Sequence, residues 1–165
     1  MNGGECDSFC GIQARAFSRY YKVYLTKNQA NLAWLAGEVY DDYSARLIAS
    51  SGQIFMPLLL LYFRRLQKRR LEREQFYDCM DVASEEFLKS DRRNLRFTTR
   101  NLATIELLKR RGASKIKAGR PTSGVVTFTD SRGAKLKLIL TDQQDLSQIE
   151  QSLRNSFGSV VRIDT

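Results

Sequence analysis

The chain has 165 residues, a length that favours one domain or two very small ones. Its hydrophobic content of 42% is enough to form a core, and the absence of histidine excludes Ser-His-Asp catalysis, Cys-His catalysis and His-ligated metal sites. The formal net charge of +9 indicates a polyanionic partner, with nucleic acid first and an anionic membrane second.

The excess positive charge lies in the middle third of the chain. Residues 61–120 carry 17 basic and eight acidic side chains, whereas residues 1–60 and residues 121–165 each carry five of either sign. Basic residues that are concentrated in one segment of an otherwise neutral chain are typical of a binding surface. A chain that is basic throughout could instead be tuned for solubility alone. We therefore expect the functional residues to lie between positions 61 and 120.

The first half of the sequence predicts three helices. Residues 13–25 have a helical composition with an aromatic face. Thr26 and Gln29 fit a capping box for a second helix, whose apolar residues follow at spacings of three and four. A third helix is expected over about 54–74, because its early part is apolar almost all round, as in a helix central to a core.

An uncharged stretch in this region has the length of a short membrane span. It covers the 17 residues 47–63 and is followed by the basic run 64–70. That length is at the lower limit for a spanning helix, and residues 50–53 and Pro57 interrupt the apolar run. The pattern therefore favours a buried core helix, with membrane association as an alternative.

Two further helices are expected on either side of a basic turn. Asp81 or Ser84 caps a brief helix that precedes the turn over 91–96. The next helix covers about 98–111 and ends at Gly112. Apolar residues at every third position give this helix one inward face.

From residue 115 onward the hydrophobic period changes to two, which is typical of strands. A last helix follows Asp142, carries an apolar stripe and ends at Gly158. The stripe consists of Leu146, Ile149, Leu153 and Phe157. The strands expected in this part are 115–117, 125–129, 135–140 and, at a sheet edge, 160–163.

The order of these elements resembles the winged helix-turn-helix DNA-binding family of bacteria, phages and plasmids. The spacing Ile105-x-x-Leu108-x-x-x-Gly112 is similar to the end of that family's recognition helix. The resemblance implies that residues 98–111 form the recognition helix and that residues 115–129 form a basic wing. It also implies an α+β fold that is mainly helical, with a small antiparallel β-meander and a C-terminal helix.

On this interpretation the chain has three parts. Residues 1–50 are an N-terminal helical extension, residues 51–130 are the winged-helix DNA-binding domain, and residues 131–165 are a C-terminal strand and helix element. The stripe of the last helix belongs either to the core or to a homodimer interface. A two-fold dimer would bind a palindromic DNA site.

Base recognition would use the first residues of the recognition helix, because Arg pairs bidentately with guanine and Asn with adenine. Arg100 and Asn101 hold these positions, and Arg120 in the wing loop would reach into the minor groove. The other expected DNA contacts, mainly to phosphates, come from Arg92, Arg93, Arg96, Thr98, Thr99, Thr104, Lys115 and Lys117.

The sequence gives little indication of other chemistry. Three cysteines without dense spacing predict free thiols in a reducing cytoplasm rather than disulfides or a metal site. Scattered carboxylates and the lack of histidine leave no nucleophile and base pair. We therefore expect no enzymatic activity, no metal and no cofactor.

The predicted function is sequence-specific binding of double-stranded DNA by a transcriptional regulator of the cytoplasm, associated with the nucleoid. A replication or partition factor of a plasmid or phage is a close alternative, since the same domain serves both. An RNA-binding nucleoprotein component would use the same basic segment. A membrane-associated protein would use residues 47–63 and their basic flank.

Overall fold

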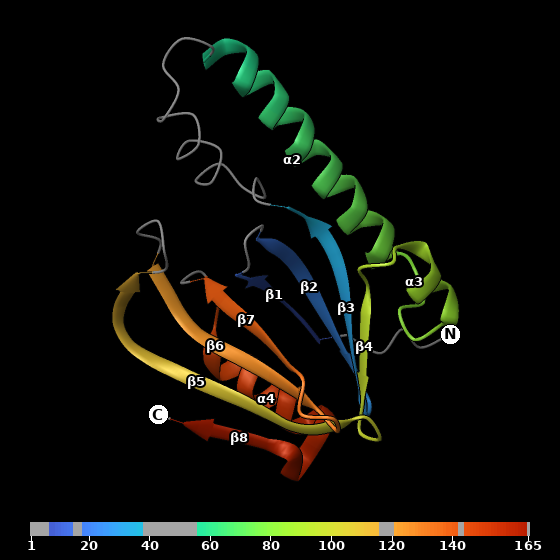
Figure 1. Ribbon diagram of the computed structural model, residues 1–165, viewed down its shortest axis with the longest axis vertical. Helices are drawn as coiled ribbons and strands as arrows, with labels where there is room; N and C mark the ends of the chain where they lie inside the picture. Colours follow the sequence, from blue (N-terminus) through green and yellow to red (C-terminus); the bar gives the residue numbers. More distant parts are fainter. Residues whose placement is uncertain (1–6, 15–17, 38–55, 116–120, 142–143, 165) are drawn as a thin grey trace.

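A computed structural model describes residues 7–14, 18–37, 56–115, 121–141 and 144–164. Within these residues eight strands form one sheet, in the order β4-β3-β2-β1-β7-β6-β5-β8 (Figure 1). Neighbouring strands are antiparallel except β5 and β8, which are parallel. The strands are β1 (Asp7–Gln13), β2 (Arg19–Thr26), β3 (Gln29–Ala36), β4 (Leu95–Thr98), β5 (Leu102–Lys115), β6 (Pro121–Asp130), β7 (Lys135–Thr141) and β8 (Val161–Asp164).

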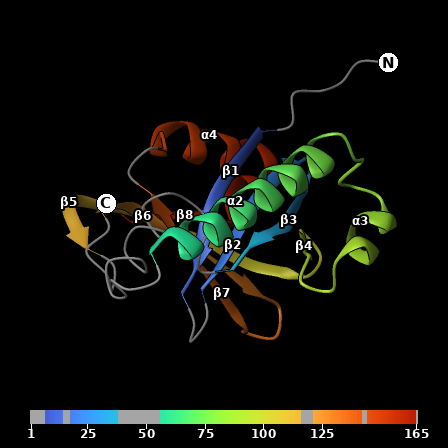
Figure 2. The same ribbon diagram turned by 90° about the horizontal axis from the view of Figure 1, so that it is seen from above.

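Helices cover parts of both faces of this sheet. They are α2 (Met56–Asp78), α3 (Glu85–Ser90) and α4 (Leu146–Phe157), and the short 3-10 helix η2 (Gly158–Val160) follows α4. Figure 1 places α4 well away from α2 and α3, and Figure 2 shows α3 beside β3 and β4. The fold is therefore a mixed sheet with separate helical layers, and the expectation of a mainly helical protein is wrong.

The alternation of side chains along the strands produces two hydrophobic clusters. On β2, Tyr21 and Val23 face the cluster that contains α4, whereas Tyr20 and Tyr24 face the cluster that contains α2 and α3. The buried apolar side chains of α4 are Ile149, Leu153 and Phe157. Strands covered on both faces are apolar at most positions, which is why the periodicity of this region is ambiguous.

The helices expected over 13–25 and from residue 26 onward are wrong where the structure describes them. Residues 19–26 and 29–36 are the antiparallel strands β2 and β3, joined by a tight turn in which Asn28 has a φ of 66°. Aromatic and β-branched residues favour strands when both faces are buried, and burial outweighed the apparent helical spacing. The remainder of the second expected helix lies outside the described residues.

The two helices that follow are confirmed as helices, but the expectation that the early part of the first is buried in the core is wrong, because Leu60, Leu61 and Tyr62 are exposed. The helix expected over about 54–74 is α2, which continues to Asp78. The brief helix is α3, with Ser84 as its N-cap; the Phe87 backbone N–H donates to Ser84 Oγ at 3.4 Å. Phe87 is fully buried against Tyr77 of α2, and the two rings are 5.5 Å apart.

The expected recognition helix over 98–111 is wrong, because Leu102–Lys115 is strand β5. A β-bulge between Leu102 and Thr104 adds one residue to the strand, so that Leu102 and Ile105, three positions apart, are both buried. The bulge thus reproduces a helical spacing within a strand. Without this helix the winged-helix arrangement of residues 51–130 is absent, and the wing region is the hairpin of β5 and β6.

The C-terminal third follows the sequence closely. Strand β7 occupies the expected residues, β8 lies at the edge of the sheet, and α4 ends at Gly158 as expected. The N-cap of α4 is Asp145, whose carboxylate accepts from the backbone N–H of Ser147 at 2.8 Å. The expected cap, Asp142, lies outside the described residues. The apolar stripe of α4 is packed within the chain, which confirms the core alternative of the two that the sequence left open.

Candidate functional site

Helix α2 carries a surface patch that combines apolar and basic side chains. Its N-terminal half extends beyond the sheet, whereas its C-terminal half lies beside β3 (Figure 1). Leu60, Leu61 and Tyr62 are 42%, 58% and 56% exposed. Basic residues follow within two turns. We define the α2 patch as Leu60, Leu61, Tyr62, Arg64, Arg65, Lys68 and Arg69, all of which are exposed.

Ion pairs neutralise little of the positive charge of this patch. Lys68 lies 3.9 Å from Glu72, and both of these side chains are more than half exposed, so their interaction is weak. Arg64, Arg65 and Arg69 form no ion pair within the described part of the chain. The patch therefore presents exposed cationic groups beside three consecutive exposed apolar side chains.

The other face of α2 is attached to the sheet by a polar network. Lys22 of β2 contacts Glu74 at 3.1 Å and Asp78 at 2.8 Å, and the Tyr24 hydroxyl donates to Asp78 at 2.7 Å. Burial and the hydrogen bond to Asp78 raise the pKa of Tyr24, so its hydroxyl stays a donor. Burial disfavours ionisation of Asp78, but the hydrogen bonds from Lys22 and Tyr24 outweigh it and lower the pKa of this carboxyl.

A pocket of about 430 Å³ lies between α2 and the end of β3, and we call it the α2–β3 pocket. It borders the α2 patch, because Tyr62 and Arg69 belong to both. Its described lining combines three arginines with apolar and aromatic side chains and contains no carboxylate. The lining residues are Ser18, Trp34, Leu35, Ala36, Gly37, Tyr62, Leu66, Arg69, Arg70 and Arg73.

Two arginines from different elements lie over the ring of Trp34. The guanidinium carbon of Arg73 is 4.2 Å and that of Arg93 is 3.1 Å from the ring centroid. Arg93 is paired with Asp91 at 2.7 Å, whereas Arg73 donates to the backbone carbonyl of Leu35 at 3.3 Å. Burial, and to a lesser extent the neighbouring Arg93, lowers the pKa of Arg73.

The structure uses several of the expected DNA contacts for internal interactions. Arg96 donates to Asn31 at 2.8 Å and to Glu85 at 2.7 Å, and it also donates to the carbonyl of Ser84. Arg93 is held by Asp91 and Trp34, as described above. These two guanidinium groups join β4 to α3 and β3, a role that explains their presence without DNA.

The remaining expected contacts are distributed over a turn and a strand. Thr99, Arg100 and Asn101 are exposed in the turn between β4 and β5, and Asn101 closes that turn by accepting from the Thr98 backbone N–H at 2.7 Å. Arg92 is exposed before β4, and Thr104 lies on β5. Lys115 is the last residue of β5, and Lys117 and Arg120 lie outside the described residues. The structure does not bring this set together on one helix face.

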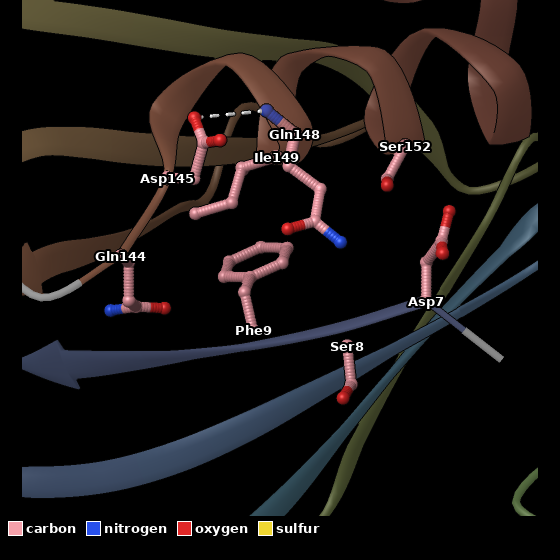
Figure 3. Close-up of a pocket in the computed structure, with 8 residues that line it drawn as sticks. All are labelled: Asp7, Ser8, Phe9, Gln144, Asp145, Gln148, Ile149 and Ser152. Carbon is pink, nitrogen blue, oxygen red and sulfur yellow. Dashed lines mark hydrogen bonds between the residues drawn. The ribbon is translucent and has the colours of Figure 1, made fainter.

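A second pocket, of about 200 Å³, lies between β1 and α4 (Figure 3). Gln144 at its edge donates to the Cys10 carbonyl at 2.7 Å and accepts from the Cys10 backbone N–H at 2.8 Å. Asp145 caps α4, and Phe9 and Ile149 lie in the core. Half of its eight lining residues thus have structural roles, so this pocket is a weaker candidate than the α2–β3 pocket.

The described residues contain no group of three or more His, Cys, Asp or Glu side chains arranged to hold a metal ion. Cys10 and Cys79 are free thiols, and Cys6 lies outside the described residues. Burial raises the pKa of the Cys10 thiol above its ordinary value of 9.0, so the reactive thiolate is disfavoured.

Among the helices that the structure describes, none has the length and apolar character needed to cross a membrane.

Comparisons with protein families, curated proteins and solved structures find no match to this chain. The site therefore has to be interpreted from its own geometry. Sequence reasoning identified the basic run 64–70 but assigned the DNA contacts to residues 92–120. It missed Trp34, since no local signal relates this residue to Arg73 and Arg93, which only the fold brings together.

Proposed function

We propose that this protein binds the surface of anionic membranes through the α2 patch. The proposal rests on three consecutive exposed apolar residues, Leu60, Leu61 and Tyr62. Exposed basic residues follow them on the same helix after the buried Phe63. Exposed leucines are unfavourable in water, and a polyanion that offers only phosphates would not cover them. A lipid surface interacts favourably with both parts of the patch.

The physical basis is that of an interfacial helix. Apolar side chains enter the boundary between headgroups and acyl chains, and tyrosine favours the same depth. Each basic side chain near an anionic lipid surface contributes about 1 kcal/mol. Arg64, Arg65, Lys68 and Arg69 lie on the same end of α2 as the apolar triplet, so the two contributions act at one contact.

Sedimentation with lipid vesicles tests this function. The protein is mixed with vesicles of phosphatidylcholine alone and with vesicles that also contain phosphatidylglycerol. We expect binding that is about tenfold or more stronger to the anionic vesicles and that weakens as salt is added. Equal binding to both compositions, or no binding to either, would contradict the proposal.

Nucleic acid is the second candidate, favoured by the same four basic side chains. Duplex DNA and RNA offer phosphates at which such residues release counterions, so binding would fall steeply with salt. The prediction of a sequence-specific regulator now lacks a recognition helix, and a contact through α2 would act mainly on the phosphate backbone. Tight binding of duplex DNA or RNA with no binding to anionic vesicles would favour this candidate.

A further inference from the structure

The α2–β3 pocket has the dimensions and lining of a small-molecule site. Its volume of about 430 Å³ lies in the range of 300–1,000 Å³ that is typical of such sites. Part of its lining is apolar and consists of Leu35, Ala36 and Leu66, with the aromatic residues Trp34 and Tyr62. This lining fits a ligand that has an apolar or aromatic part.

Three arginines of α2, Arg69, Arg70 and Arg73, also line the pocket and make it cationic. Arg69 and Arg73 are four positions apart on α2, a spacing at which like charges destabilise a helix. Arg70 is paired with Glu74 at 3.1 Å, but Glu74 does not line the pocket. An anion inside the pocket would offset the repulsion between these arginines.

The sheet edge holds these groups in place. Asn94 Oδ1 accepts from the Trp34 backbone N–H at 2.9 Å, and Arg73 donates to the Leu35 carbonyl at 3.3 Å. Both contacts use backbone groups of β3 beyond the point where β4 pairs with it. These contacts hold the β3 backbone at Trp34 and the guanidinium of Arg73, and the guanidinium groups of Arg73 and Arg93 over the ring restrict the indole, as a preorganised binding site requires.

From this arrangement we infer that the α2–β3 pocket binds a small organic phosphomonoester, with its phosphate on Arg69 and Arg73 and its apolar part against Tyr62, Leu66 and the edge of the Trp34 ring, whose faces are covered by Arg73 and Arg93. Guanidinium groups match phosphate oxygens with two parallel hydrogen bonds. Burial, followed by the neighbouring Arg93, lowers the pKa of Arg73, and a bound dianion would favour the charged form of this side chain. Binding of a free ligand here does not depend on the membrane function proposed above.

Trp34 is the only tryptophan of the chain, so its fluorescence reports on the pocket directly. The probes are phenyl phosphate, inorganic phosphate and phenol. We expect a saturable change with phenyl phosphate, a weaker one with inorganic phosphate and no saturable change with phenol. A response to phenol equal to that of phenyl phosphate would overturn the assignment of the phosphate to the arginines.

Two arginine variants provide the matched comparison. Arg69 and Arg65 are both exposed on α2 and differ in that only Arg69 lines the pocket. Arg69→Gln should raise the Kd for phenyl phosphate by about tenfold or more, and Arg65→Gln should leave it nearly unchanged. Equal effects of the two substitutions would overturn the inference, since they would indicate only a general loss of charge.

The same phosphate could be supplied by a lipid headgroup. Vesicles of phosphatidylcholine with phosphatidic acid, whose headgroup is a phosphomonoester, form the second arm. Arg69→Gln and Arg65→Gln remove the same charge from the α2 patch, so both should weaken binding to these vesicles; a fluorescence change with the vesicles but not with phenyl phosphate, reduced far more in Arg69→Gln than in Arg65→Gln, would support the site and assign its ligand to the membrane. If neither phosphate source gives a change that depends on Arg69, the inference is wrong even if the vesicles sediment the protein.

Discussion

At the scale of single residues, Asn94 holds together three parts of the fold. Its side chain is buried, with 6% of the residue exposed, and connects β3, α2 and α3. Its oxygen accepts from the Trp34 backbone N–H at 2.9 Å, and its amide group donates to the Phe87 carbonyl at 2.8 Å and to the Tyr77 hydroxyl at 3.0 Å. The expected turn over 91–96 gave no indication of this role.

The substitution Asn94→Ala should lower the free energy of unfolding by about 2–4 kcal/mol, because it leaves the Trp34 backbone N–H without this partner and removes the buried amide that joins the Phe87 carbonyl to the Tyr77 hydroxyl. Urea denaturation measures the change. Asn155→Ala, at an exposed position of α4, is the control and should change the free energy by less than about 0.5 kcal/mol. A similar small change for Asn94→Ala would show that the network contributes little.

Asp91 makes stability depend on pH at the acidic end. The hydrogen bond from Arg93 lowers the pKa of this carboxyl below its ordinary value of 3.8. Because the pKa of this carboxyl is lower in the folded than in the unfolded protein, its ionised form stabilises the fold. This contribution to the free energy of unfolding is fully present above the pKa of the unfolded state and is lost as the pH falls through the pKa of the folded state. Asp91→Asn should thus be less stable than the natural protein at neutral pH, with the difference shrinking below about pH 4.

Urea denaturation at several pH values measures this difference. A difference in stability that stays constant from neutral pH to well below pH 4 would contradict the role assigned to the Asp91 carboxylate.

At the scale of elements, β5 and β6 approach closely where the hairpin register shifts. A Cβ added at Gly124 would lie 2.8 Å from the backbone carbonyl oxygen of Leu108, too near for either strand to remain in place. Gly124→Ala should therefore lower the free energy of unfolding by about 1–3 kcal/mol. Thermal or urea unfolding measures this, with Gly37→Ala as the control.

Gly37 is a matched control because a Cβ there would meet nothing within 4 Å. That variant should be about as stable as the natural protein. Equal stability of the two alanine variants would mean that the hairpin adjusts freely at Gly124.

The elements show which sequence signals are dependable and which are not. The segments of β7, α3 and α4 were predictable because alternation or caps such as Ser84 mark them locally. Strands β2 and β3 were not, since they are covered on both faces and show no alternation. The bulge at Leu102 gave β5 a helical spacing, which no local pattern distinguishes from a true helix.

At the scale of the whole molecule, the net charge of +9 indicates a polyanionic partner but does not identify the residues that would bind it. The sheet divides the basic middle third into separate surfaces. Arg93 and Arg96 are used in internal contacts, whereas the α2 patch exposes its charges beside Leu60, Leu61 and Tyr62. A basic side chain is exposed or internally paired depending on the tertiary contacts around it, and these contacts cannot be predicted from the sequence alone.

The proposed membrane function requires that the α2 patch enters a lipid surface with its apolar residues. The basic side chains alone would bind nucleic acid equally well, so substitution of a leucine is what distinguishes a lipid surface from nucleic acid as the partner. Leu61 and Leu71 are 58% and 53% exposed on the same helix. Ten residues separate them, or about 15 Å along the axis. Only Leu61 belongs to the α2 patch.

The decisive measurement is the affinity of Leu61→Ser and Leu71→Ser for vesicles that contain phosphatidylglycerol, obtained by sedimentation. Removing an apolar side chain from the contact should weaken binding by about tenfold, as expected from the burial of a leucine. We predict this loss for Leu61→Ser and an affinity close to that of the natural protein for Leu71→Ser. Equal affinities of both variants and the natural protein would contradict the membrane function.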